Sequence, residues 1–123
     1  MQGGDQSPIP RPSPFELERF ARAINAQQFY EAHEILEEAW IALGRPRPSF
    51  VQGLVQLAAG LEQLKRNNTF GARTLTQRGL ENCSLDPSGL PGPAYRFLQE
   101  MKEYAEAGFQ GPYPEIRHET SSD

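Results

Sequence analysis

The segment between Phe50 and Arg66 limits the possible folds more than any other part of this chain. Its apolar residues recur every three or four positions, as they do on one face of an α-helix, and they cover more than half of the helix circumference. A helix with so wide an apolar face is usually surrounded by others, so we expect it at the centre of a helical bundle. Gly53 and Gly60 lie at one edge of that face, where they would let a second helix approach closely.

Four further segments carry the same helical period, and no segment shows the alternation that predicts a strand. The first begins with an N-cap residue, Ser13, followed by a proline and by Glu16, which completes a capping box. Ser49 and Gln52 repeat the capping-box pattern before the central segment. The predicted helices run from residue 13 to about 25, 28 to 43, 49 to 66, 70 to 82 and 94 to 107. We therefore predict an all-α fold, a single bundle of about five helices with the second and third as a central antiparallel pair.

The two ends of the chain differ in composition from its middle. Residues 1–12 are rich in glycine, proline and serine, so we predict a disordered N-terminal segment. Residues 13–108 form the predicted helical domain. Residues 109–123 form a C-terminal tail whose aromatic side chains can dock on the bundle, while its last residues are predicted to be disordered.

Composition disfavours several classes of protein. A formal net charge of −4 disfavours a non-specific nucleic-acid binder. The single cysteine, Cys83, leaves no intrachain disulfide and suits a reducing compartment. The sequence shows neither a secretory signal at its start nor an apolar stretch long enough to cross a bilayer. We therefore expect a cytoplasmic protein that binds neither membrane nor nucleic acid, and a homo-oligomer stays open.

One motif in the second predicted helix carries chemistry. It contains His33, one of only two histidines in the chain, with Glu37 four residues later and Trp40 three beyond that. Positions i and i+4 share one face of a helix, close enough for their side chains to share a proton or a metal ion. The helical wheel places Glu37 at or within the buried face, where a carboxylate is rarely found without a partner. We therefore predict a polar pair inside the bundle.

This motif, together with the sequence QGLVQLAA at residues 52–59, resembles the family known as domain of unknown function 309. The resemblance extends from about Phe15 to Leu80 and implies a small all-helical protein of the bacterial and archaeal kind. In that family the shared motif has been suggested to bind metal. The resemblance therefore implies His33 and Glu37 as ligands of a divalent metal ion. Many relatives have a second histidine in the third helix, where this chain has Gln63, so one potential ligand is missing.

A divalent metal ion or a small polar ligand is the leading interpretation of the motif, with hydrolysis as an activity that such a site can support. Histidine nitrogen and glutamate oxygen suit manganese, iron or magnesium better than an ion that prefers thiolates. Two protein ligands are few, so a third would come from the side chains of the next helix, from the tail or from a partner chain. The candidates in this chain are Gln56, Gln52, Glu62 and His118. Tyr30 and Trp40 are predicted to wall the pocket, with Gln56 and Gln52 as further pocket residues.

Three other interpretations of the His33–Glu37 pair stay open. The pair can be structural, with imidazole and carboxylate satisfying each other inside the bundle. It can be an acid–base dyad without metal, in which Glu37 orients the imidazole. The protein can also be a helical interaction module built from helix pairs like those of tetratricopeptide repeats, in which the pair merely fixes helix register. Whether the protein is an enzyme is left open by the sequence.

Overall fold

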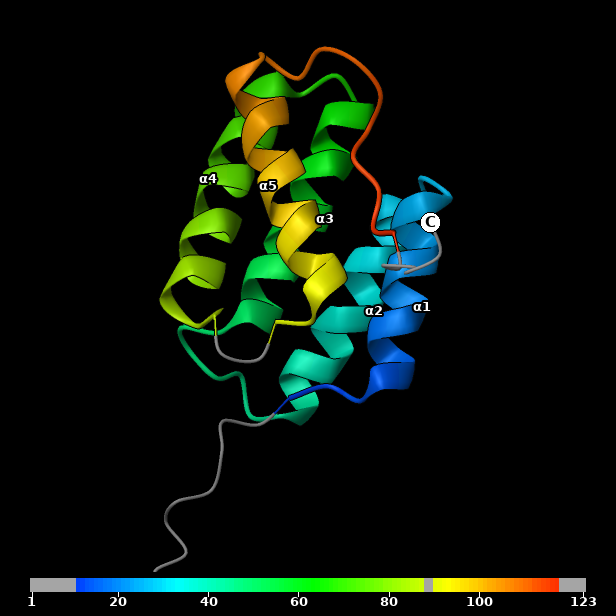
Figure 1. The fold of residues 1–123 in the computed structure, drawn as a ribbon, viewed down its shortest axis with the longest axis vertical. Coiled ribbons are helices and arrows are strands. Elements are labelled where there is room, and N and C mark those ends of the chain that lie inside the picture. Colours follow the sequence, from blue (N-terminus) through cyan, green and yellow to red (C-terminus); the bar gives the residue numbers. More distant parts are fainter. Residues whose placement is uncertain (1–10, 88–89, 118–123) are drawn as a thin grey trace, which may run out of the picture.

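The computed structural model describes residues 11–87 and 90–117, and in these ranges the chain forms five α-helices and no strand. Residues 1–10 of the predicted disordered segment and His118 of the tail lie outside the described residues. The helices are α1 (Pro14–Asn25), α2 (Phe29–Ala42), α3 (Phe50–Lys65), α4 (Thr69–Leu85) and α5 (Gly92–Glu106). Short turns connect α1 to α2, α2 to α3 and α3 to α4, so consecutive helices run antiparallel (Figure 1). Across the described residues, no helix is both long enough and apolar enough to cross a membrane.

Two of the helix starts follow the predicted capping chemistry. At α1, the Ser13 hydroxyl accepts a hydrogen bond from the Glu16 N–H, and the Glu16 carboxylate accepts one from the Ser13 N–H, which completes the capping box. At α3, Ser49 caps only one N–H, that of Gln52 at 3.0 Å. Asp86, at the end of α4, supplies the second cap, because its buried carboxylate accepts a hydrogen bond from the Phe50 N–H at 3.0 Å. The start of α3 is therefore tied to the end of α4.

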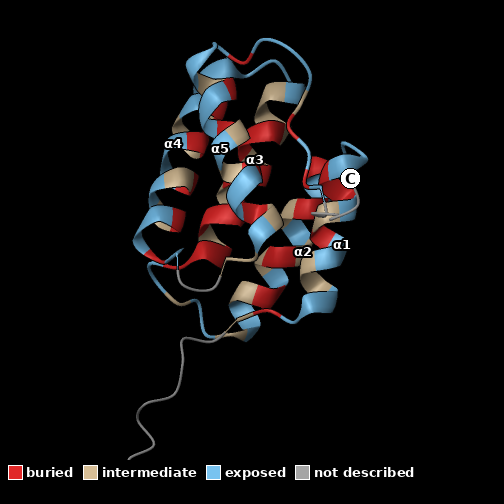
Figure 2. Ribbon diagram, in the orientation of Figure 1, coloured by how far each residue is buried: buried red, intermediate tan, exposed pale blue. Residues whose placement is uncertain are grey.

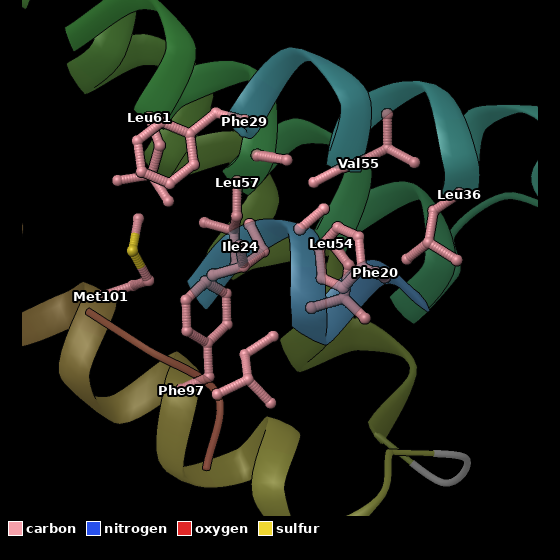
Figure 3. Packing of buried hydrophobic residues seen from close by; sticks show 14 of the residues in the cluster. Phe20, Ile24, Phe29, Leu36, Leu54, Val55, Leu57, Leu61, Phe97 and Met101 are labelled. Carbon is pink, nitrogen blue, oxygen red and sulfur yellow. The ribbon is translucent and has the colours of Figure 1, made fainter. Parts of the chain in front are cut away.

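The core lies along α3, as its wide apolar face predicts. Figure 2 shows buried residues on the inward sides of all five helices. In Figure 3, Leu57 and Leu61 of α3 lie in one cluster with side chains of α1, α2 and α5. The largest fully buried side chains are Phe20, Phe29, Phe50, Phe97, Ile24, Leu36, Leu54, Leu57, Leu61, Met101, Val51 and Thr76. Every helix contributes to this list, so the described residues form one continuous hydrophobic core.

The most closely packed helix pair is α3 with α4, whereas α2 with α3 was the predicted central pair. Glycines explain the close approach: a Cβ built on Gly53 would overlap the Cys83 sulfur and lie 2.7 Å from the Gly79 carbonyl oxygen. A Cβ on Gly79 would in turn lie 2.7 Å from the Gly53 carbonyl oxygen. The prediction that glycines of the third helix admit another helix is confirmed, and that helix is α4. α3 remains central, with α2 on one side and α4 on the other.

The segment after α5 docks on the bundle, as its aromatic residues predicted. It crosses from the end of α5 towards α1 and α2 (Figure 1). The Tyr113 ring packs edge-on against the ring of Phe29, with centroids 5.0 Å apart. The Asn25 side chain accepts a hydrogen bond from the Ile116 N–H at 2.7 Å and donates one to the Ile116 carbonyl at 2.8 Å. This paired bond holds the C-terminal segment at the end of α1.

The α3–α4 contact predicts how alanine is tolerated in place of each glycine of α3. Gly53→Ala is expected to lower the free energy of unfolding by about 2 kcal/mol, because overpacking outweighs the gain in helix propensity. Gly60→Ala is the matched control: its new methyl group would meet Thr76 Oγ1 at 3.0 Å and the Ala72 carbonyl at 3.3 Å, which is a milder conflict. Urea unfolding of both variants measures the difference. Equal stability of Gly53→Ala and the parent would contradict the close packing.

Burial of Cys83 predicts an unreactive thiol. Its side chain is buried against α3, and its Sγ lies 3.6 Å from the Phe50 carbonyl oxygen. Burial, with a smaller contribution from the Asp86 charge, raises the pKa of this thiol from 9.0 to about 12. At pH 8 the thiolate population should therefore be about a thousandfold lower in the folded protein than in the unfolded chain. Alkylation by iodoacetamide, followed by mass spectrometry with and without urea, measures this ratio; comparable rates in both conditions would contradict it.

Candidate functional site

The predicted pair forms, but it lies near the surface. His33 Nε2 is 3.4 Å from Glu37 Oε1, which is an ion-pair distance and longer than a well-formed N–H···O hydrogen bond. The His33 side chain is 24% exposed and that of Glu37 is 42% exposed. Glu37, predicted at or within the buried face, is half-buried at the edge of that face, and the prediction of a pair inside the bundle is wrong. Its neighbours Leu36 and Ala39 take buried positions of α2.

His33 lines a pocket between α2 and α3 with a volume of about 240 Å³. The pocket is lined by Tyr30 and His33 from α2 and by Ala59, Glu62, Gln63 and Arg66 from α3. Tyr30 is the predicted pocket wall that the structure places here, and its ring centroid lies 5.9 Å from that of His33. Gln63, the position at which relatives of the resembled family carry a second histidine, also lines this pocket.

The two glutamines expected in the pocket, Gln52 and Gln56, do not line it. Because α2 and α3 run antiparallel, His33 near the start of α2 lies opposite the end of α3. Gln56 lies nearer the start of α3 and points to α4, where its side-chain oxygen accepts a hydrogen bond from Asn82 at 2.7 Å. Gln52 lies one turn earlier still, and its buried Oε1 has no hydrogen-bond partner in the described part of the chain. The predicted contacts of Gln52 and Gln56 with the His33–Glu37 pair are therefore wrong, because the antiparallel direction of α2 and α3 places the end of α3 beside His33.

Trp40 supports the chain that follows α2 and is not a wall of the pocket. Its indole Nε1 donates a hydrogen bond to the Pro46 carbonyl at 3.0 Å. The Arg47 guanidinium carbon lies 5.6 Å from the centroid of the indole ring, within the range of a cation–π contact. Trp40 therefore fastens the turn between α2 and α3 to α2, as expected of a packing residue.

Carboxylates outnumber cations around the pocket. Tyr30 donates a hydrogen bond to Glu34, and this bond, followed by the Glu34 charge itself, raises the pKa of the Tyr30 phenol. The charge of Glu37 raises that pKa further, whereas the charge of Arg66 lowers it, so both groups lie close enough to influence the phenol. On α3, the carboxylate of Glu62 is bonded to the guanidinium of Arg66 at 2.7 Å. Glu37 thus lies beside His33 and Glu34 beside Tyr30, while the Glu62–Arg66 pair lines the pocket.

The donor set does not suit a closed, dehydrated metal site. No group of three or more His, Cys, Asp or Glu side chains in residues 11–87 and 90–117 is placed to hold a metal ion. Glu62 is paired with Arg66, and Gln63 Oε1 accepts a hydrogen bond from Asn68 at 2.7 Å. Two protein ligands, His33 and Glu37, would leave most coordination positions of a divalent ion to water.

Comparison with known proteins identifies the region that contains the pocket. The family model described as domain of unknown function, DUF309, matches residues 17–75. Residues 17–75 belong to the DUF309 family. The match runs from α1 into the first half of α4 and includes every residue that lines the α2–α3 pocket. No curated protein and no solved structure matches the chain.

Arg66 is a pocket residue that the His33–Glu37 motif did not predict. Its position seven residues after Ala59 puts both on the same face of α3, two turns apart. That spacing alone could have grouped Ala59, Glu62, Gln63 and Arg66 as one stripe. The antiparallel direction of α2 would then have placed the stripe opposite Tyr30 and His33.

The role of Trp40 yields a prediction that separates support of the turn from ligand contact. Trp40→Phe keeps an aromatic ring but removes the N–H that bonds the Pro46 carbonyl. The expected loss is about 1 kcal/mol of unfolding free energy, the usual contribution of one partly buried hydrogen bond. The backbone amide signals of Tyr30 and Gln63 in a ¹H–¹⁵N spectrum should stay in place. Large shifts at these pocket residues would instead assign Trp40 to the pocket.

Proposed function

We propose that the α2–α3 pocket of this DUF309 protein binds a small cation, either a hydrated divalent metal ion or an organic amine. The observation that carries the proposal is the excess of carboxylates around His33. Glu62 lines the pocket, Glu37 pairs with His33, Glu34 acts on Tyr30, and Arg66 is the single fixed cation among the groups described above. A partly enclosed site of this charge attracts positive ligands more strongly than open surface does, because its protein walls reduce solvent screening.

The long distance within the His33–Glu37 pair favours binding over a purely structural role. At 3.4 Å the two groups are not held in a tight hydrogen bond, so a ligand can take up the acceptor capacity of Glu37 at little cost. A hydrated ion suits this arrangement, because water can fill the positions that two protein ligands leave open. An amine suits it equally, since its N–H groups can donate to Glu37 and to Glu62.

Any hydrolytic activity of the pocket would have to use water as the nucleophile. The lining residues include no serine, threonine or cysteine. His33 is the lining side chain that can accept a proton from water. Binding is therefore the proposed function, with acid–base chemistry at His33 as the extension that a substrate would require.

The position of the His33–Glu37 pair argues against the alternative of a helical interaction module in which this pair fixes helix register. A polar pair fixes the register between two helices only when its members come from different helices. His33 and Glu37 both belong to α2, so their contact aligns nothing with α3. Exposed aromatic residues such as Phe15 and Phe70 remain as possible contact points for another protein, but they belong to different helices and do not involve the pair.

The test is a titration of ¹⁵N-labelled protein with Mn²⁺ in one arm and methylammonium in the other. Binding in the pocket predicts paramagnetic broadening by Mn²⁺, or chemical-shift changes with methylammonium, centred on the amides of Tyr30, His33 and Gln63. Glu37→Gln and Glu62→Gln should each weaken binding about five- to tenfold, the usual effect of removing one nearby charge.

Glu38→Gln is the matched control, because Glu38 is an exposed neighbour on α2 that neither lines the pocket nor pairs with His33. This variant should change the affinity less than twofold. Equal weakening in all three variants would mean that the acidic surface attracts cations without a site. The absence of a localised response in both arms would overturn the proposal.

A further inference from the structure

A second pocket lies between α4 and α5 and has a volume of about 600 Å³. It is lined by Leu80, Glu81, Cys83, Ser84, Pro87, Leu90, Tyr95, Leu98, Gln99 and Lys102. All of these residues follow position 75, so the pocket lies outside the part of the chain that matches DUF309. Its volume falls within the range of small-molecule sites in proteins, about 300–1,000 Å³.

Two helical stripes that face each other build this groove. On α5, Tyr95, Leu98 and Lys102 follow the spacing of a single helix face. Phe97 and Met101 lie on the adjoining face of α5 and point into the core (Figure 3). The stripe borders this core face: Leu98 packs against the core, whereas Tyr95 and Lys102 are exposed.

The groove is apolar along its walls and charged at one end. α4 runs towards the connecting loop and α5 runs away from it, so Glu81 and Lys102 both lie at the end far from the loop. At the loop end, the Tyr95 hydroxyl donates a hydrogen bond to the Pro87 carbonyl at 3.3 Å and closes the groove. Leu80 precedes Glu81 on α4 and Leu98 lies one turn before Lys102 on α5, so these two leucines line the walls beside the charged end. The groove is therefore an apolar slot, and we call its charged end, at Glu81 and Lys102, the mouth.

The two charges at the mouth are available to a ligand. Within the described ranges, neither Glu81 nor Lys102 forms an ion pair, although they lie on facing walls of one groove. Glu100 of α5, by contrast, is paired with Arg117 at 2.9 Å. An unpaired carboxylate and an unpaired ammonium at the mouth of an apolar slot match a molecule that carries both opposite charges at one end.

We propose that the α4–α5 groove binds an apolar α-amino acid. Its ammonium group pairs with Glu81, its carboxylate pairs with Lys102, and its side chain enters the slot between Leu80 and Leu98. Opposite charges on adjacent carbons of the ligand bridge the two walls, which neither an amine nor an acid alone can do. This site is independent of the cation pocket, which lies between α2 and α3.

The test is a ¹H–¹⁵N titration of the full chain with L-phenylalanine, phenethylamine and 3-phenylpropionate. L-Phenylalanine should shift amides within residues 80–84 and 95–102, and each single-charge analogue should bind about fivefold more weakly because one ion pair is lost. Glu81→Gln should remove the preference for L-phenylalanine over 3-phenylpropionate but keep that over phenethylamine. Lys102→Met should show the reverse pattern.

Arg96→Gln and Glu106→Gln serve as controls, since both residues are exposed on α5 and neither lines the groove. Both should keep the parent preference among the three compounds. Thermal unfolding checks that each variant is folded. The proposal is overturned if L-phenylalanine causes no shifts confined to the groove, or if the two groove variants leave its selectivity unchanged.

Discussion

The backbone contact between α3 and α4 at Gly53 and Gly79 is the constraint on which the rest of the bundle depends. Because each glycine lies against the carbonyl of the other, the two helices approach more closely than side chains would allow. This contact brings Cys83 onto the Phe50 carbonyl and Asp86 onto the Phe50 N–H. The start of α3 is thereby fixed. The other sides of α3 contact α2 and the core residues of α1 and α5. α3 lines the α2–α3 pocket, whereas the α4–α5 groove has no lining residue from α3.

The limits of the helices were predictable because the signals that set them are local. The capping box at Ser13 and the cap at Ser49 lie within three residues of the groups they satisfy. The predicted starts and ends therefore agree with the structure to within a few residues for each helix. The largest difference is at the end of α4, which continues to Leu85 beyond the predicted residue 82. The added turn is held by Cys83 and Asp86, whose partners on α3 are more than thirty residues away.

The membership of the pocket was less predictable, because it depends on the register between helices. The i, i+4 relation of His33 and Glu37 follows from helix geometry alone and is confirmed by their 3.4 Å separation. Which residues of α3 lie opposite His33 depends on the length of the connecting turn and on how the core packs. Gln56 illustrates the difficulty, because it lies on a helix that has neighbours on two sides. Its side chain points to α4, and the end of α3 faces His33 instead.

The two pockets differ in how far their charges are already satisfied, and this difference governs what each can bind. In the α2–α3 pocket, Glu62 is neutralised by Arg66 and Tyr30 is bonded to Glu34, so Glu37 is the acceptor with most capacity to spare. A ligand there competes with contacts inside the protein, which favours weak and selective binding of a small cation. In the α4–α5 groove, Glu81 and Lys102 need not give up an ion pair when a ligand arrives. Binding at the groove therefore costs only the loss of hydration from exposed groups, and its selectivity should follow from the separation of the two charges.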